Sequence, residues 1–418
     1  MAAKQPRHQP QRGPRPLVSQ ADLSRLAQGL DPETKRRLSR VVRLWARIKR
    51  DGGKVVVATG SGPNLHEGVT CMVAELVRLG LVDGVLTSSA VVGHEMGGVL
   101  ERVRRVEGAK LGLERAVLPA DGKVEVSLLG PEQLAQLAAH TNLDRDLYRR
   151  MLSAPGNEII KVAGNLAYPT GLWVERMARE LGHLAKAAAQ PLEAVLGLGC
   201  DPLTMLGACA RRGVPCLVTV PQLVGGGQVG LAVGDSIGIS QRSARVAALL
   251  ASADLIIESG VALTQEIHDG PFELFTGHGM WARHEGMDTF SLGSKAMVRI
   301  DLDPNLERVW QMQRDAQAVA QAIDRGTPKA TGFKVPFRME MSGFARLPGA
   351  LPLTGDLGVI WPLLASRAAK AMGVKTDFVC YKQGTPPGEA VRRYIVTKLS
   401  PLNYPQVVQA LKEKSLWP

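Results

Sequence analysis

The chain has 418 residues, of which 45% are hydrophobic and 22% charged, a composition typical of a globular protein with one large core or two domains. Its apolar runs fall short of the ~20 residues of a membrane span, and its N-terminus lacks the apolar stretch of a signal peptide. We therefore expect a cytoplasmic protein with no membrane partner. The five cysteines show no Cys-x-x-Cys spacing, which argues against a disulfide framework and a thiolate zinc site.

The net charge of +12 comes largely from the beginning of the chain. Residues 1–18 are rich in Pro, Gln and Arg and have little apolar surface to bury, so we predict a disordered basic tail. Residues 19–53 have a helical pattern and form a lead-in to the first strand. Because only Trp45 interleaves with the basic residues, we interpret the charge as a tail and a solvated helix face, and we do not expect a nucleic-acid partner.

The pattern of a parallel sheet starts at Lys54. A β-branched run, Val55–Val57, breaks at Gly60 and Gly62, and a helical pattern follows. A second apolar run from Val82 to Leu86 ends in hydroxyl residues. This order of strand, glycine turn, helix and strand predicts a βαβ unit.

Similar units continue along the chain. After Gly98 we expect a helix, then an insertion over residues 108–150, and a strand, turn and helix from Glu158 to Leu184. Further strands are predicted at 214–220 and 254–258, with a glycine-rich ligand-hugging loop between them and a helix at 244–251. The alternation predicts a doubly wound α/β fold with a mainly parallel sheet over a domain of residues 54–372. Residues 373–418 are expected to wrap the surface.

Candidate site residues gather where predicted strands end. Parallel sheets bind ligands outside the carboxyl ends of their strands. There, glycines admit a ligand and polar groups offer hydrogen bonds. The first two strands supply Gly60, Gly62, Asn64, Thr87, Ser88, Ser89, His94 and Glu95.

Other signatures are absent or incomplete. GSGPNLHEG is not G-x-G-x-x-G, so a nucleotide-binding turn and an ordinary tight turn both remain open. Three His-Glu pairs occur without H-E-x-x-H spacing, and we expect no metal. Lys295 stands between a Gly-Ser turn and an apolar strand, where it is either a desolvated Schiff-base nucleophile or a surface lysine.

Several segments, in the same order along the chain, resemble the deoxyhypusine synthase superfamily. TGSGPNLHEG and LVDGVLTSSAVVGHE resemble its T-S-N-L turn and V-D-V-L-V-T-T strand. VAGNLAYP resembles I-G-N-L-x-x-P, and RRGVPCLVTVPQLVGGGQVG resembles the strand before P-A-x-x-D-G-S-x-G. GDLGVIWPLL resembles the closing helix.

This resemblance implies a Rossmann-like sheet, a homotetramer, and NAD as cofactor. It also implies an enzyme of the transferase class that oxidises a polyamine such as spermidine to an imine and transfers an aminobutyl group, with a protein lysine as a possible acceptor. The cofactor-binding residues would be the eight at the ends of the first two strands. Asn165, Gly226, Gly227 and Asp269 would bind the substrate, and His268, Glu285 and Lys295 would be catalytic.

Two departures keep other functions open. The lysine motif S-W-G-K appears only as Ser291 to Lys295 with an extra residue, and D-G-S is replaced by Gly226-Gly227-Gln228. The stretch from Ser89 to Glu95 also resembles the G-N-A-x-A-V-H-D-x-E of NAD-dependent ornithine cyclodeaminases. That group shares the oxidation of an amine but not the aminobutyl transfer. A nucleotide-binding scaffold that has lost catalysis is a further alternative.

Overall fold

The computed structural model describes residues 17–60, 63–98, 103–112, 114–118, 122–127, 169–223, 226–260, 292, 294–301 and 350–416. Two helices occupy the lead-in, α1 (Gln20–Gln28) and α2 (Pro32–Arg50). Each starts at a side-chain cap, because Ser19 accepts the N–H of Asp22 and Asp31 accepts the N–H of Thr34. Val18, which the sequence places in the disordered tail, is buried in the core.

The predicted βαβ unit is present. Strand β1 (Val55–Thr59) is followed by the short helix α3 (Pro63–His66), by α4 (Val69–Arg78) and by β2 (Gly84–Thr87). The polar residues after β2 begin a further helix, α5 (Ser89–Gly97), which Ser88 caps. Gly68, at φ +73°, occupies the left-handed conformation that the turn between α3 and α4 requires.

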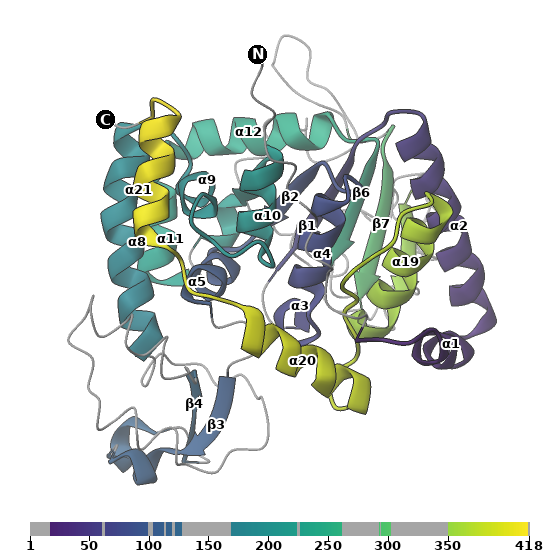
Figure 1. The fold of residues 1–418 in the computed structure, drawn as a ribbon, viewed down its shortest axis with the longest axis horizontal. Coiled ribbons are helices and arrows are strands. Elements are labelled where there is room, and N and C mark those ends of the chain that lie inside the picture. Colours follow the sequence, from purple (N-terminus) through teal and green to yellow (C-terminus); the bar gives the residue numbers. More distant parts are fainter. Residues whose placement is uncertain are drawn as a thin grey trace, which may run out of the picture.

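The prediction of a helix after Gly98 is wrong. The chain instead forms a strand, β3 (Val103–Glu107), which pairs antiparallel with β4 (Lys123–Ser127) as a separate two-stranded sheet. Two 3-10 turns, η1 (Gly108–Leu111) and η2 (Arg115–Val117), lie between the strands. Figure 1 shows this hairpin projecting from the main body. Val103 and Val106, the β-branched residues on either side of Arg104 and Arg105, favour a strand, and the pairing with β4 decides it.

The middle of the chain is mainly helical. Its elements are α8 (Pro169–Ala187), α9 (Leu192–Gly197), α10 (Met205–Arg212), β5 (Cys216–Val218), η3 (Val220–Gln222), α11 (Gln228–Ser236), α12 (Ile239–Ala251) and β6 (Leu255–Ser259). The expected glycine-rich loop is shorter than predicted, because α11 begins directly after Gly227.

The remaining elements complete the sheet and its covering. They are β7 (Ala296–Asp301), β8 (Ala350–Thr354), α19 (Leu357–Ala371), α20 (Pro386–Lys398) and α21 (Tyr404–Glu413). The segment from residue 373 onward does more than wrap the surface, since Cys380, Ile395 of α20 and Leu411 of α21 are buried in the main core.

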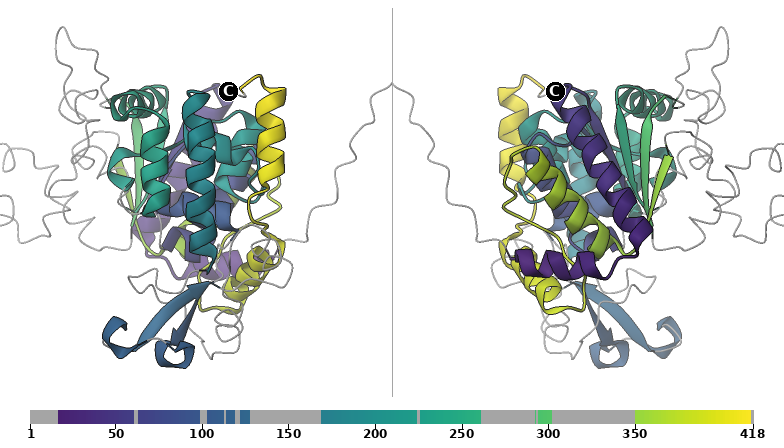
Figure 2. Two further views of the ribbon diagram at one scale, coloured as in Figure 1. Left: turned by 90° about the vertical axis from the view of Figure 1, so that its left-hand side faces the viewer. Right: turned by 90° about the vertical axis from the view of Figure 1, so that its right-hand side faces the viewer.

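One six-stranded sheet organises the molecule, in the order β5-β2-β1-β6-β7-β8, and every neighbouring pair is parallel. Alternate residues of β1 enter different cores, Val55 and Val57 with α4 and α19, Val56 and Ala58 with α12. Helices therefore cover both faces (Figure 2). This confirms the predicted doubly wound, mainly parallel α/β fold.

Candidate functional site

The strand order defines a topological switch point. Numbered along the chain, the six strands run 3-2-1-4-5-6, the order of the dinucleotide-binding doubly wound fold. Strand β1 lies between β2 and β6, so the connections leave in opposite directions at β1 and β6. Ligands bind at the carboxyl ends of the two strands at this switch point. In this chain those ends are Thr59-Gly60 and Ser259-Gly260.

Asn64 joins the two sides of the switch point. Its Nδ2 donates to the carbonyl of Ser259 at 3.3 Å, and its Oδ1 accepts from the Ser259 hydroxyl. The same hydroxyl accepts the Nε1–H of Trp361 at 2.8 Å. All three side chains are buried. Asn64 therefore holds α3, and with it the end of the glycine turn, against β6 and α19.

The hydroxyl residues after β2 have defined structural partners. Ser88 caps α5 by accepting the N–H of Val91 at 3.2 Å. The Ser89 hydroxyl lies 2.7 Å from the carbonyl of Gln222 and 2.6 Å from that of Leu223. These contacts tie the start of α5 to the segment that follows β5, so the carboxyl ends of two neighbouring strands are joined.

Two glycines let the segment after β5 approach Ser89. A Cβ on Gly226 would lie 2.4 Å from the Ser89 Oγ, which only glycine avoids. Gly227, at φ 56° and ψ −131°, forms the N-cap of α11. At Gly226 the backbone closely approaches Ser89, and the role of the two glycines in binding a substrate stays a prediction.

Thr219 is a candidate that the sequence analysis missed. Its N–H donates to the carbonyl of Thr87 at 3.2 Å, so the two threonines end adjacent strands at the carboxyl edge. Both side chains are 1% exposed, and neither Oγ1 has a hydrogen-bond partner within the described part of the chain. Buried hydroxyls are ordinarily satisfied, so these two are candidates to bind a ligand. The signal in the sequence was a hydroxyl residue directly after an apolar run.

Glu95 has a well-defined position within the core. Its two carboxylate oxygens accept the backbone N–H groups of Met205 and Leu206, at 2.8 and 2.9 Å, at the start of α10. The side chain is fully buried, and this burial raises its pKa to about 7, against the lowering effect of the two N–H groups. Glu95 thus positions α10 against α5. The preceding His94 is half-buried on α5.

A buried ion pair supports the segment that carries Thr219. The Arg242 guanidinium pairs with Glu193 and donates to the carbonyls of Val218, at 3.1 Å, and Val233, at 2.7 Å. Glu193 also accepts the N–H of Val218 at 2.8 Å. The pair therefore fixes the end of β5 to α9, α11 and α12.

A second perturbed carboxylate follows α3. Glu67 accepts the N–H of Gln383, and burial, followed by the nearby Asp356 carboxylate, raises its pKa to about 7. Lys382 forms an ion pair with Asp356 at 3.2 Å. This cluster joins α3 to the start of α19 and to the segment before α20.

Lys295 lies away from this edge. It immediately precedes β7, at the amino end of the strand, and its Nζ donates to the carbonyl of Ala251 at 2.6 Å. A strand of this length separates its two ends by about 20 Å. The structure therefore does not bring Lys295 together with Asn64 or Thr87.

The other predicted site residues lie outside the described residues. They are Gly62, Asn165, His268, Asp269 and Glu285. Within the part of the chain that is described, no group of three or more His, Cys, Asp or Glu side chains could hold a metal ion. None of the helices searched there is long and apolar enough to cross a membrane.

No protein-family model matches the chain, and no curated protein matches it by sequence. Solved structures with a similar fold include ArgZ, an arginine dihydrolase from the ornithine-ammonia cycle in cyanobacteria, at 14% identity and a TM-score of 0.38. The match covers 84% of this chain and 32% of ArgZ. AgrE, in a ternary complex with ornithine and NAD+, matches at 15% identity and a TM-score of 0.36, over 84% of this chain and 34% of AgrE.

A LOR/SDH protein from Methanococcus maripaludis matches at 12% identity and a TM-score of 0.38, over 88% of this chain and 76% of that protein. The chain thus spans about a third of the length of ArgZ and AgrE.

Proposed function

We propose that this chain is an NAD-dependent enzyme that oxidises a carbon bearing an amino group, with an activity of the ornithine cyclodeaminase type. The observation that carries the proposal is the strand order, which puts a switch point of the kind that binds dinucleotides in doubly wound folds at the ends of β1 and β6. NAD would supply the acceptor for the hydride that leaves the amine substrate.

The residues at the carboxyl edge fit such a cofactor. Thr87 and Thr219 present buried hydroxyls that need partners, and the hydroxyl groups of a ribose would provide them. Gly60 allows close approach at the switch point, and Asn64 holds the end of the turn in place through Ser259. Ser88, Ser89, His94 and Glu95 would act with them, the last by fixing the helices around the switch point.

The position of Lys295 favours the cyclodeaminase type over aminobutyl transfer. Transfer through a lysine requires its amine to reach the substrate carbon, which must lie near the cofactor. Lys295 is at the amino edge of the sheet, with its amine bound to a backbone carbonyl. Oxidation of the amine to an imine, ring closure by the second amino group of the substrate with loss of ammonia, and return of the same hydride to the ring need no such lysine. Asp269, His268 and Glu285 remain our proposed groups for binding the ammonium or moving its proton, and Asn165, Gly226 and Gly227 for lining the substrate site.

The test is turnover by the purified chain with a catalytic amount of NAD and either ornithine or spermidine. We expect ammonia and a cyclised amino acid from ornithine. We also expect calorimetry to show NAD binding that weakens in a Thr87→Val, Thr219→Val variant. Lys295→Ala should leave ornithine turnover intact.

Aminobutyl transfer from spermidine that Lys295→Ala abolishes would move the assignment to the deoxyhypusine synthase type. Binding of NAD without turnover of any amine would leave the non-catalytic scaffold. A chain that does not bind NAD at all would refute the proposal at its main point.

A further inference from the structure

Helix α2 carries a row of arginines on its outer side. Arg36, Arg40, Arg43, Arg47 and Arg50 follow one another at alternating spacings of four and three residues, and all five are exposed. Such spacings place side chains on one face of a helix, so the five form a line about 21 Å long. We call this line the arginine row. From sequence alone these charges are expected only to form a solvated helix face.

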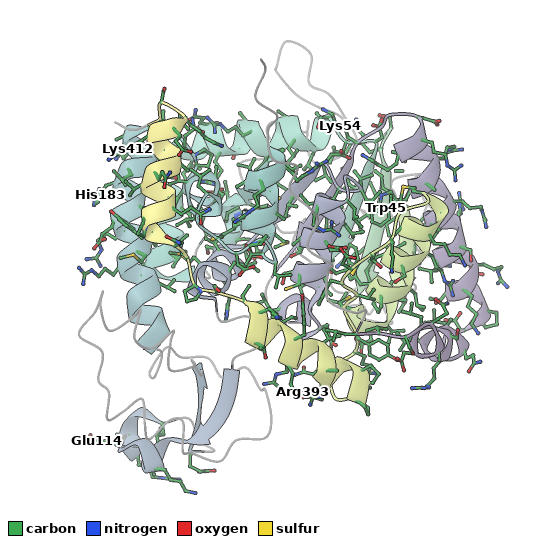
Figure 3. All side chains as sticks on the ribbon, viewed as in Figure 1. Trp45, Lys54, Glu114, His183, Arg393 and Lys412 are labelled. Carbon is green, nitrogen blue, oxygen red and sulfur yellow. The ribbon has the colours of Figure 1, made fainter. Side chains whose placement is uncertain are left out.

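The opposite side of α2 explains why the row faces outward. Leu38, Val41 and Trp45 are fully buried, and the Trp45 Nε1–H donates to the carbonyl of Leu81 at 3.1 Å. Figure 3 shows Trp45 on the inner side of α2 and nitrogen-tipped side chains extending from its outer side. The helix packs against α19 and the edge strand β8, so the orientation of the row is fixed by the core.

Intramolecular partners satisfy only the ends of the row. Arg36 pairs with Glu33, and Arg50 donates to the carbonyl of Ala371 at 3.2 Å. Arg40, Arg43 and Arg47 have no ion pair or hydrogen bond within the described part of the chain. A hollow of about 600 Å³ lies against the first half of the row, lined mainly by Lys35, Arg37 and three members of the row.

The row is unfavourable for the isolated helix. Like charges at i, i+3 and i, i+4 repel and destabilise a helix, and the row contains four successive pairs of this kind. The helix dipole favours cations only near the C-terminus, which accounts for Arg47 and Arg50 but not for Arg36 and Arg40. An external polyanion would reverse this repulsion.

We propose that the arginine row binds the phosphodiester backbone of a nucleic acid without reading its bases. A linear row of guanidinium groups matches a linear polyanion, and arginine binds phosphate oxygens through two parallel hydrogen bonds. The net charge of +12 strengthens the long-range attraction. Because the row contains no aromatic side chain on which bases could stack, recognition is confined to the backbone. This surface is separate from the switch point between β1 and β6.

The test is fluorescence anisotropy of a labelled mixed-sequence DNA duplex over roughly 50 to 200 mM salt. The variant Arg40→Gln, Arg43→Gln, Arg47→Gln removes the centre of the row. Its control is Arg179→Gln, Lys186→Gln, Lys414→Gln, three exposed cations on α8 and after α21, on the opposite side of the molecule (Figure 1). Both variants lose three positive charges. A third variant lacks residues 1–16, and circular dichroism verifies the fold of each.

We expect the row variant to bind the duplex at least about tenfold more weakly. The slope of the logarithm of its association constant against the logarithm of the salt concentration should become less negative by about 2.7 if each arginine contacts one phosphate. The control and the tail deletion should each keep most of the affinity. An equal loss in the row variant and its control would show a general charge effect and overturn the proposal. Loss only on deletion of the tail would also overturn it. The proposal would also be overturned if poly-glutamate or anionic phospholipid vesicles competed as effectively as unlabelled duplex at equal charge. The partner would then be an acidic protein or a membrane.

Discussion

Replacing Arg242 with Met should destabilise the fold severely while the matched change at an exposed ion pair does not. Arg242 and Glu193 are both inaccessible to solvent, and the guanidinium also satisfies the carbonyls of Val218 and Val233. Methionine fills a similar volume but leaves the Glu193 carboxylate buried without its countercharge. Breaking a buried pair in this way costs about 3–5 kcal/mol, a large fraction of the 5–15 kcal/mol that stabilises a typical domain.

Urea unfolding followed by far-UV circular dichroism measures this loss. The control is Arg36→Met, which removes one of the two arginine partners of Glu33 in a pair whose side chains are 70% and 46% exposed, and which should leave the stability nearly unchanged. The double variant Glu193→Gln, Arg242→Met should be more stable than the sum of the two single changes predicts, because neither position carries a buried unpaired charge in it. Additive effects, or a loss below about 1 kcal/mol for Arg242→Met, would refute the assigned role of the pair.

The further predictions concern the carboxylates Glu95 and Glu67, the glycine Gly226 and the lysine Lys295. The pKa of Glu95 rises from 4.5 to about 7 on folding, so its contribution to the free energy of unfolding is fully present below pH 4.5 and is lost as pH rises through 7. Unfolding at a series of pH values should show that the free energy of unfolding decreases by about 3 kcal/mol over this range, and the Glu95→Gln variant should not show this decrease. Glu67→Gln should flatten the same window further, since its pKa is raised in the same direction. Gly226→Ala should weaken NAD binding at least about tenfold in calorimetry, because the new methyl group would collide with Ser89. Lys295→Met should leave the turnover of an amine substrate unchanged, because its amine is bound at the other edge of the sheet.

Each of these has a clear contrary result. Stability that rises between pH 4.5 and 7 and falls in Glu95→Gln would mean that the carboxylate is ionised in the fold. Gly238→Ala is the control for Gly226→Ala, since a Cβ at Gly238 meets no atom within 4 Å. Equal effects of the two substitutions on NAD binding would exclude a specific contact with Ser89. Loss of turnover in Lys295→Met, with the fold intact, would restore the lysine to the mechanism.

The amino-acid sequence by itself determined the repeating strands and helices of the sheet. Apolar runs such as Val55–Val57 and Leu255–Ile257 are long enough and β-branched enough to form buried parallel strands, and the helical spacing after the first of them predicts its crossover. Ser19 and Asp31 cap the two helices of the predicted helical lead-in, as their residue types predict. These features depend on neighbours in the chain, so periodicity and capping reveal them.

Only the tertiary structure decided which of these residues meet. The order of the strands, with β6 beside β1, comes from long-range packing that no local pattern encodes, and it places Ser259 against Asn64 across the switch point. Lys295 lies at the amino edge of the sheet, opposite the edge that carries Asn64. A residue just before a strand and a residue just after it look alike in a sequence of apolar runs and polar turns. Tertiary packing also aligned the charges of α2 into one exposed row, because the buried face of the helix fixes its rotation about its axis.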